Sequence, residues 1–136
     1  MATQQEQIQE ITQIIADRLI ALSQENNIKL LDLRIKIDCI NNNMVYALMD
    51  KTVIVRKITL KDALNMKGIF DALKLGVIAN YLKKGLSYYA NQQGVSLNDL
   101  NCRLYTTKES GEPSAFLFNN MQPLKKITIE ELLQIK

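Results

Sequence analysis

Hydrophobic residues near the start of the chain recur at helical spacing. They are separated by three or four residues, which places them along one side of a helix, while glutamine, glutamate and aspartate fill most other positions. These residues are Ile8, Ile11, Ile15, Leu19 and Leu22. Asn26-Asn27 follows, and asparagine tolerates the left-handed conformation that ends many helices. The pattern predicts a helix over residues 4–25.

The hydrophobic period then changes to two. Between residues 28 and 40, apolar side chains alternate with charged ones, which is typical of a strand with one buried and one wet face. A second β-rich stretch covers residues 44–58. Asp50-Lys51 within it forms either a tight turn between two short strands or a bulge in one long strand. Because neither residue is the glycine that a two-residue hairpin turn prefers, we favour a long, bent hairpin.

A second long helix is predicted over residues 69–92, and it carries two apolar stripes. One stripe consists of Phe70, Leu73, Val77 and Tyr81, and the other of Leu75, Ile78, Leu82, Leu86 and Tyr89. Together they cover well over half of the helix, so we expect it to be central in the fold or sandwiched between its own sheet and a partner. Gly76 and Gly85 each cost about 1 kcal/mol relative to alanine, which indicates a close backbone approach or a kink.

The last third of the chain is predicted to form a hairpin and a short helix, and its final residues repeat an earlier sequence segment. Strands are expected at 102–106 and 115–118, and Thr128 with Glu131 forms a capping box that opens the helix. Residues 57–64 (KITLKDAL) return as residues 126–133 (KITIEELL). Thr59 is accordingly expected to cap a short helix that ends near residue 66.

These elements predict one α+β domain over residues 1–136, in which an antiparallel sheet packs against two helices. The order is helix, long hairpin, long helix, hairpin and short C-terminal helix, which can be read as two αββ-like halves. The internal similarity would then relate residues 4–66 to residues 69–135. The alternative is chance similarity, because a chain rich in Ile, Leu, Lys and Asn produces short matches easily.

Composition narrows the class of protein. The 136 residues are 47% hydrophobic and 23% charged, as in an ordinary globular chain. The longest apolar run, residues 44–49, is far shorter than the roughly 20 residues of a membrane-spanning helix. The first residues lack the features of a secretory signal, and the two cysteines, Cys39 and Cys102, are expected to be reduced and buried. We therefore expect a cytoplasmic protein, or one in a particle assembled in the cytoplasm.

The residue types present argue against catalysis. The chain contains no histidine, which removes the commonest general base and the histidine-based nucleophile systems. Two cysteines without histidine cannot complete a zinc site, and no glycine-rich phosphate loop is present. We therefore expect no enzyme activity, catalytic residue, metal, cofactor or small-molecule substrate.

The net charge of +3 is distributed unevenly. Residues 29–84 carry eleven Lys and Arg against five Asp, which gives +6, whereas residues 1–28 carry −3. The basic side chains that could share one exposed face, toward nucleic acid or an acidic partner, are Arg34, Lys36, Arg56, Lys57 and Lys61. The alternative is a solvated sheet face, because Tyr46 is the only aromatic residue in the first half of the chain.

The leading hypothesis is a non-catalytic structural protein that assembles as a homo-oligomer, in its most concrete form a phage neck or tail-ring component. The candidate interface residues are Ile78, Leu82, Tyr88 and Tyr89. The alternative is a small basic protein that binds nucleic acid through the hairpin 28–58. The element order, without any residue motif, is similar to that of phage neck and tail-terminator proteins and of class I chaperones of type III secretion. The latter resemblance implies a chaperone-like dimer, although those chaperones are typically acidic.

Overall fold

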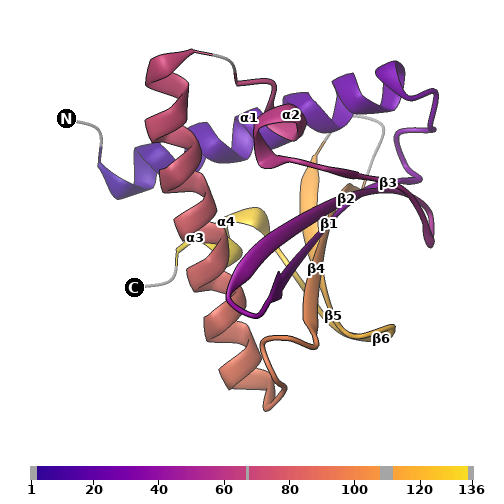
Figure 1. Cartoon of the computed structure of the whole chain (residues 1–136), viewed down its shortest axis with the longest axis vertical. Helices are drawn as coiled ribbons and strands as arrows, with labels where there is room; N and C mark the ends of the chain where they lie inside the picture. Colours follow the sequence, from indigo (N-terminus) through magenta and orange to yellow (C-terminus); the bar gives the residue numbers. More distant parts are fainter. Residues whose placement is uncertain (1–2, 67, 108–111, 135–136) are drawn as a thin grey trace.

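The structure, a computed structural model, describes residues 3–66, 68–107 and 112–134. Within these ranges the chain forms four helices and six strands (Figure 1). The helices are α1 (Gln4–Glu25), α2 (Leu60–Leu64), α3 (Ile69–Gln93) and α4 (Ile129–Leu133). The strands are β1 (Leu33–Ile40), β2 (Asn43–Asp50), β3 (Val53–Ile58), β4 (Leu100–Thr106), β5 (Pro113–Asn119) and β6 (Gln122–Ile127). The strands form one antiparallel sheet in the order β3-β2-β1-β4-β5-β6, which confirms the predicted α+β class.

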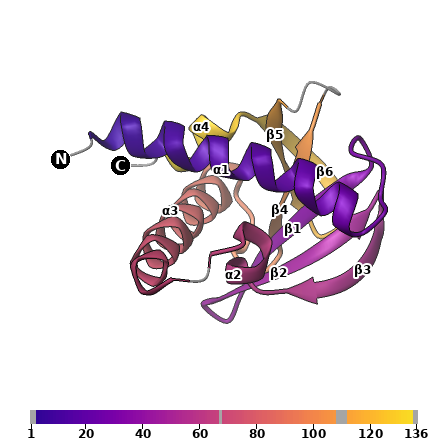
Figure 2. The same ribbon diagram turned by 90° about the horizontal axis from the view of Figure 1, so that it is seen from above.

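The helices gather on one face of the sheet. In Figure 1, α1 runs across the top and α3 descends at the left, and the view from above in Figure 2 places both on the same side of the strands. The strand residues that face the helices, such as Leu33, Ile35 and Ile37 of β1, belong to one buried core with α1 and α3. Their neighbours Arg34 and Lys36 lie on the opposite face, which no described helix covers. We call this second surface the open face.

The two halves of the chain contain the same elements in the same order, helix-strand-strand-strand-short helix. Details of the backbone recur as well. Lys51 and Asn120 both have positive φ, and their N–H groups donate to the carbonyls of Asp32 at 2.7 Å and Asp99 at 2.8 Å. A β-bulge interrupts the β2–β3 pairing and another interrupts the β5–β6 pairing. Strands β1 and β4, the first strand of each half, pair antiparallel at the centre of the sheet, so the strand order runs outward in the same sequence on both sides.

Each half contains a third strand: in the first half it corresponds to the alternative of two short strands joined by a tight turn, and in the second half it was not predicted. The long, bent hairpin favoured over residues 44–58 is wrong, because β2 and β3 are separate strands that pair with each other. Lys51 adopts φ 56° and makes the turn without glycine, held by its hydrogen bond to Asp32. In the second half β6 was missed, since Pro123 and consecutive lysines hide its alternation.

The predicted ends of the helices are confirmed. Thr59 Oγ1 accepts a hydrogen bond from the N–H of Asp62, and Thr128 forms a reciprocal capping box with Glu131. Helix α1 has its predicted bounds, and α3 extends one residue beyond residue 92. The two cysteines are free and buried, as expected, and burial raises the pKa of Cys102 to about 12.

Candidate functional site

The predicted basic residues separate into two groups. Arg34 and Lys36 of β1 lie on the open face. Ala47 of β2 is directly opposite Lys36, and Lys57 of β3 is directly opposite Ala47. Because residues directly opposite each other share a face, Lys57 lies on the open face as well. The structure therefore brings three of the five candidates together.

Arg56 and Lys61 belong to a different surface, so the prediction that all five share one face is wrong. The β-bulge pairs Arg56 with Leu48, a core residue on the helix side of the sheet. Arg56 Nη2 donates to Asn26 Oδ1 at 3.3 Å, while Lys61 lies on α2.

On the open face, one row of side chains crosses the whole sheet. Its members are directly opposite each other on successive strands, in the order Lys57, Ala47, Lys36, Arg103, Phe116 and Lys126. Because neighbouring strands are about 4.8 Å apart, the row spans about 24 Å. Four of its six residues are cationic, and we call it the basic row.

Aromatic side chains from the second half of the chain lie beside this row. The guanidinium of Arg34 is 4.9 Å from the centre of the Tyr105 ring, and that of Arg103 is 3.9 Å from the centre of the Phe118 ring. The rings of Phe116 and Phe118 are 5.2 Å apart. Stacking holds both guanidinium groups in place while their N–H edges can still donate to an anion.

Both arginines are partly desolvated. Burial lowers the pKa of Arg34, although Tyr105 and Asp32 oppose this effect, and burial together with the charge of Arg34 lowers the pKa of Arg103. Among the described residues, the buried Nε of Arg103 has no hydrogen-bond partner. An anion between the two arginines would therefore be favourable, because it would compensate charges that the sheet has removed from water.

The open face is strongly cationic. Among the residues of the six strands, five cations (Arg34, Lys36, Lys57, Arg103 and Lys126) and one carboxylate, Asp38, lie on it, which gives +4 against +3 for the whole chain. Asp38 lies 3.7 Å from the ammonium of Lys36. A hollow of about 300 Å³ opens on this face, and its walls include Arg34, Arg103, Tyr105, Phe116 and Phe118. Its volume is at the lower end of the range for small-ligand pockets.

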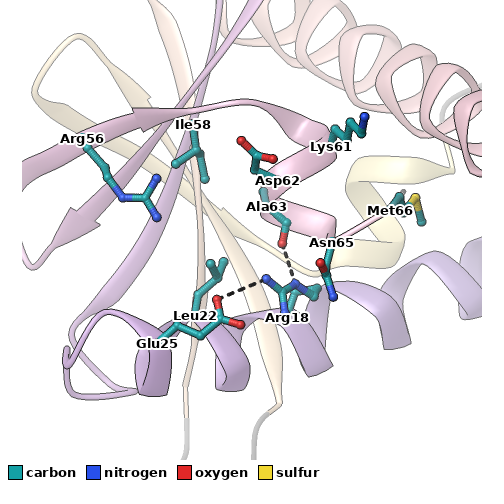
Figure 3. Close-up of a pocket in the computed structure, with 10 residues that line it drawn as sticks. All are labelled: Arg18, Leu22, Glu25, Arg56, Ile58, Lys61, Asp62, Ala63, Asn65 and Met66. Carbon is teal, nitrogen blue, oxygen red and sulfur yellow. Dashed lines mark hydrogen bonds and ion pairs between the residues drawn. The ribbon is translucent and has the colours of Figure 1, made fainter. Parts of the chain in front are cut away.

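The second group of basic residues lines a cleft between α1, β3 and α2, shown in Figure 3. The cleft has a volume of about 660 Å³ and an apolar floor that includes Leu22 and Ile58. Arg18 reaches into it from α1, where its Nε donates to the carbonyl of Ala63 at 2.7 Å and its Nη2 lies 3.6 Å from Glu25.

Three of the four candidate interface residues are core residues. Ile78 is 0% exposed, Leu82 is 2% exposed and Tyr89 is 5% exposed, because this stripe of α3 packs on the sheet and α4. Only Tyr88 of the four is accessible. The exposed stripe of α3 is the other one, in which Leu73 is 75% exposed and Val77 is 46% exposed.

The sequence pattern missed Arg103, Lys126 and the aromatic residues of the open face. Their positions depend on the pairing of β1 with β4, which joins residues almost seventy positions apart. The internal similarity was the available indication, because aligning residues 28–33 with residues 95–100 makes Arg103 the equivalent of Lys36.

The part of the chain that the structure describes was compared with two further kinds of site. No group of His, Cys, Asp or Glu residues within the described part of the chain could hold a metal ion. None of the described helices is long and apolar enough to span a membrane. No protein-family model, curated protein or solved structure matches the chain.

Proposed function

We propose that this protein binds single-stranded nucleic acid through the open face. The observation that carries the proposal is the basic row, in which four cations cross the sheet beside Tyr105, Phe116 and Phe118. Cations along a groove contact the phosphates of a nucleic-acid backbone, and aromatic rings on an exposed sheet stack with bases. The row supplies affinity without sequence preference, because phosphate contacts do not distinguish bases.

The aromatic residues favour a nucleic acid over other polyanions. An acidic protein surface or polyphosphate would contact the cations but gain little from Phe118 or Tyr105. Single strands are favoured over duplexes, because only an unstacked base can enter the hollow between Arg34 and Arg103.

The test is fluorescence anisotropy with labelled oligo-dT and oligo-U at several salt concentrations. The double variant Lys57→Ser/Lys126→Ser removes the two exposed ends of the row. It should weaken binding and reduce the slope of log K against log salt by about 1.4, or 0.7 for each lost phosphate contact. Lys84→Ser, which removes an exposed cation from α3, is the matched control and should leave the slope unchanged.

Phe118→Leu separates stacking from charge. Loss of one stacking ring should weaken binding by about 1–3 kcal/mol without changing the salt dependence. Absence of binding by the unaltered protein at low salt would refute the proposal. Equal affinity for polyphosphate and oligo-dT would show that the aromatic residues do not contribute to binding.

A second candidate function is assembly into a homo-oligomer, and the exposed stripe of α3 favours it. Leu73, Val77 and Tyr88 expose large apolar side chains, and Gly76 beside them has open space around its Cα. A partner helix could approach closely at this glycine. In this function the protein is a structural subunit, as in a virion ring, or a chaperone-like dimer.

Light scattering after size-exclusion chromatography tests this candidate. Val77→Asp should convert an oligomer into a monomer, whereas Ile20→Asp, which alters an exposed apolar residue of α1, should not. A strict monomer over the accessible concentration range would argue against self-assembly in solution.

A further inference from the structure

The cleft between α1, β3 and α2 exists because the two halves differ at one pair of equivalent positions. In the second half, Gly85 of α3 lets the backbone of α4 approach so closely that a Cβ atom at Gly85 would lie 2.2 Å from the carbonyl oxygen of Leu132. In the first half, the equivalent carbonyl, that of Ala63, instead accepts a hydrogen bond from Arg18. Asn27 and Gly94, which both have positive φ and make the same backbone hydrogen bond at the end of their helix, align α1 with α3 so that Arg18 is equivalent to Gly85. Arg18 therefore occupies the place of Gly85, and α2 cannot approach α1 as α4 approaches α3.

One smaller side chain in the first half also enlarges this space. In the second half, Tyr89 of α3 is buried and Lys125 of β6 lies over its ring at 5.8 Å. The equivalent residues of the first half are Leu22 and Arg56, which line the cleft. The shorter Leu22 leaves open the volume that the tyrosine ring fills in the other half.

The cleft adjoins a free edge of the sheet. Strand β3 is the last strand on its side, and Val53, Ile54 and Val55 at its start are 65%, 52% and 48% exposed. The opposite edge, β6, carries Pro123 and consecutive lysines, which discourage the addition of another strand. The first three residues of β3 carry no such protection, while its later residues Arg56 and Ile58 line the cleft.

Charge distinguishes the occupants that this edge could accept. Full antiparallel pairing with β3 of a second copy would place Arg56 of one copy diagonally across from Lys57 of the other, and like charges on neighbouring strands are unfavourable. The ionisable groups lining the cleft are three cations, Arg18, Arg56 and Lys61, against two carboxylates, Glu25 and Asp62, a net +1. Figure 3 shows the guanidinium of Arg56 directed toward the cleft. The complementary partner is an extended segment with a carboxylate side chain.

We propose that β3 and the cleft form a docking site for an extended, acidic segment of another protein, which adds to the sheet as a seventh strand. Its backbone pairs with β3, its apolar side chains cover Val53 and Val55, and a glutamate or aspartate enters the cleft beside Arg56. Val53 and Arg56 lie on the helix side of the sheet, whereas Lys57, the one residue of the basic row in β3, lies on the open face. The proposal is therefore independent of nucleic-acid binding.

The test uses the peptide acetyl-Thr-Val-Glu-Val-Thr-Val-amide and its glutamine counterpart as probes, with the full-length protein. Amide hydrogen exchange should slow along β3 when the glutamate peptide is added, and the glutamine peptide should bind about three- to fivefold more weakly, as expected for loss of a partly exposed charge pair. Arg56→Ala should abolish this preference for glutamate. Lys125→Ala, at the equivalent position of β6, should preserve it.

Three results would overturn the proposal. The first is that neither peptide slows exchange along β3, and the second is that Arg56→Ala and Lys125→Ala have the same effect on the preference for glutamate. The third is slow exchange along β3 that depends on protein concentration without any peptide, which would identify a second copy as the occupant. Loss of oligo-dT binding bears on the basic row alone, so failure of the two proposals can be told apart.

Discussion

Asp38 is the one carboxylate of the six strands that lies among the five cations of the open face. Burial raises its pKa, and the nearby Lys36 and Arg103 only partly offset this effect. Its carboxylate would also face the phosphates of a bound strand. The residue thus opposes both the stability of the fold and the proposed function.

Asp38→Asn should stabilise the protein increasingly as the pH rises. Because the pKa of Asp38 is higher in the folded state than in the unfolded state, the fold loses stability as the pH rises from the unfolded pKa, about 3.9, through the folded pKa. Asparagine does not ionise, so the variant does not lose this stability. Thermal unfolding followed by circular dichroism at several pH values measures the difference between variant and unaltered protein. A difference that stays constant from acid to neutral pH would contradict this interpretation. At neutral pH the variant should also bind oligo-dT more tightly.

Individual residues were predictable from the sequence where a local rule applies. Thr59 and Thr128 were predictable as helix caps because each is followed by an acidic residue three positions later, which reports local geometry. The face of Arg56 was not predictable, because the bulge opposite Leu48 shifts the alternation by one residue. A one-residue shift moves a side chain to the other face of a sheet.

At the scale of elements, the two helical glycines of α3 have opposite roles. Gly85 faces α4, whose backbone leaves no room for a Cβ atom, whereas Gly76 faces open space. The sequence indicated a close approach or a kink at both, and the structure confirms a close approach only at Gly85. Nothing in the pattern distinguishes them, because the contact is made by α4, which lies almost fifty residues further along the chain.

Gly85→Ala should destabilise the fold by about 1–3 kcal/mol or more, because α4 must move away from α3. Gly76→Ala should stabilise it by up to about 1 kcal/mol through helix propensity alone. Urea unfolding measures both changes, and each variant is the control for the other. Equal effects of the two substitutions would show that the contact between Gly85 and Leu132 does not determine the packing of α4.

Long, regular elements were the most predictable. Helix α1 and the alternation of β1 follow directly from their hydrophobic periods. The third strand of each half was not predictable by the same means. Both are edge strands with mostly exposed residues, so burial imposes little alternation on them, and the β2–β3 turn uses Lys51 rather than glycine.

At the scale of the whole molecule, the halves share one sheet and one core. Arg103 pairs with Lys36 at the centre, so the basic row is continuous only when β1 and β4 are paired. Helix α1 contacts β4, β5 and α4 of the other half, and Gln134 Nε2 donates to Gln5 Oε1 at 3.2 Å. Neither half can bury the apolar face of its own strands completely without the other.

Fragments 1–66 and 68–136 should therefore fold together but not separately. Each fragment alone exposes a central strand and much of the core, so neither should show a cooperative thermal transition. Mixed in equal amounts, they should form a one-to-one complex whose melting temperature rises with concentration, because folding is then linked to association. Circular dichroism and light scattering of the separate and mixed fragments measure this. If either fragment alone unfolds cooperatively, and addition of the other does not change this transition, the halves are independent units. The basic row would then join two folded units and would not cross one shared core.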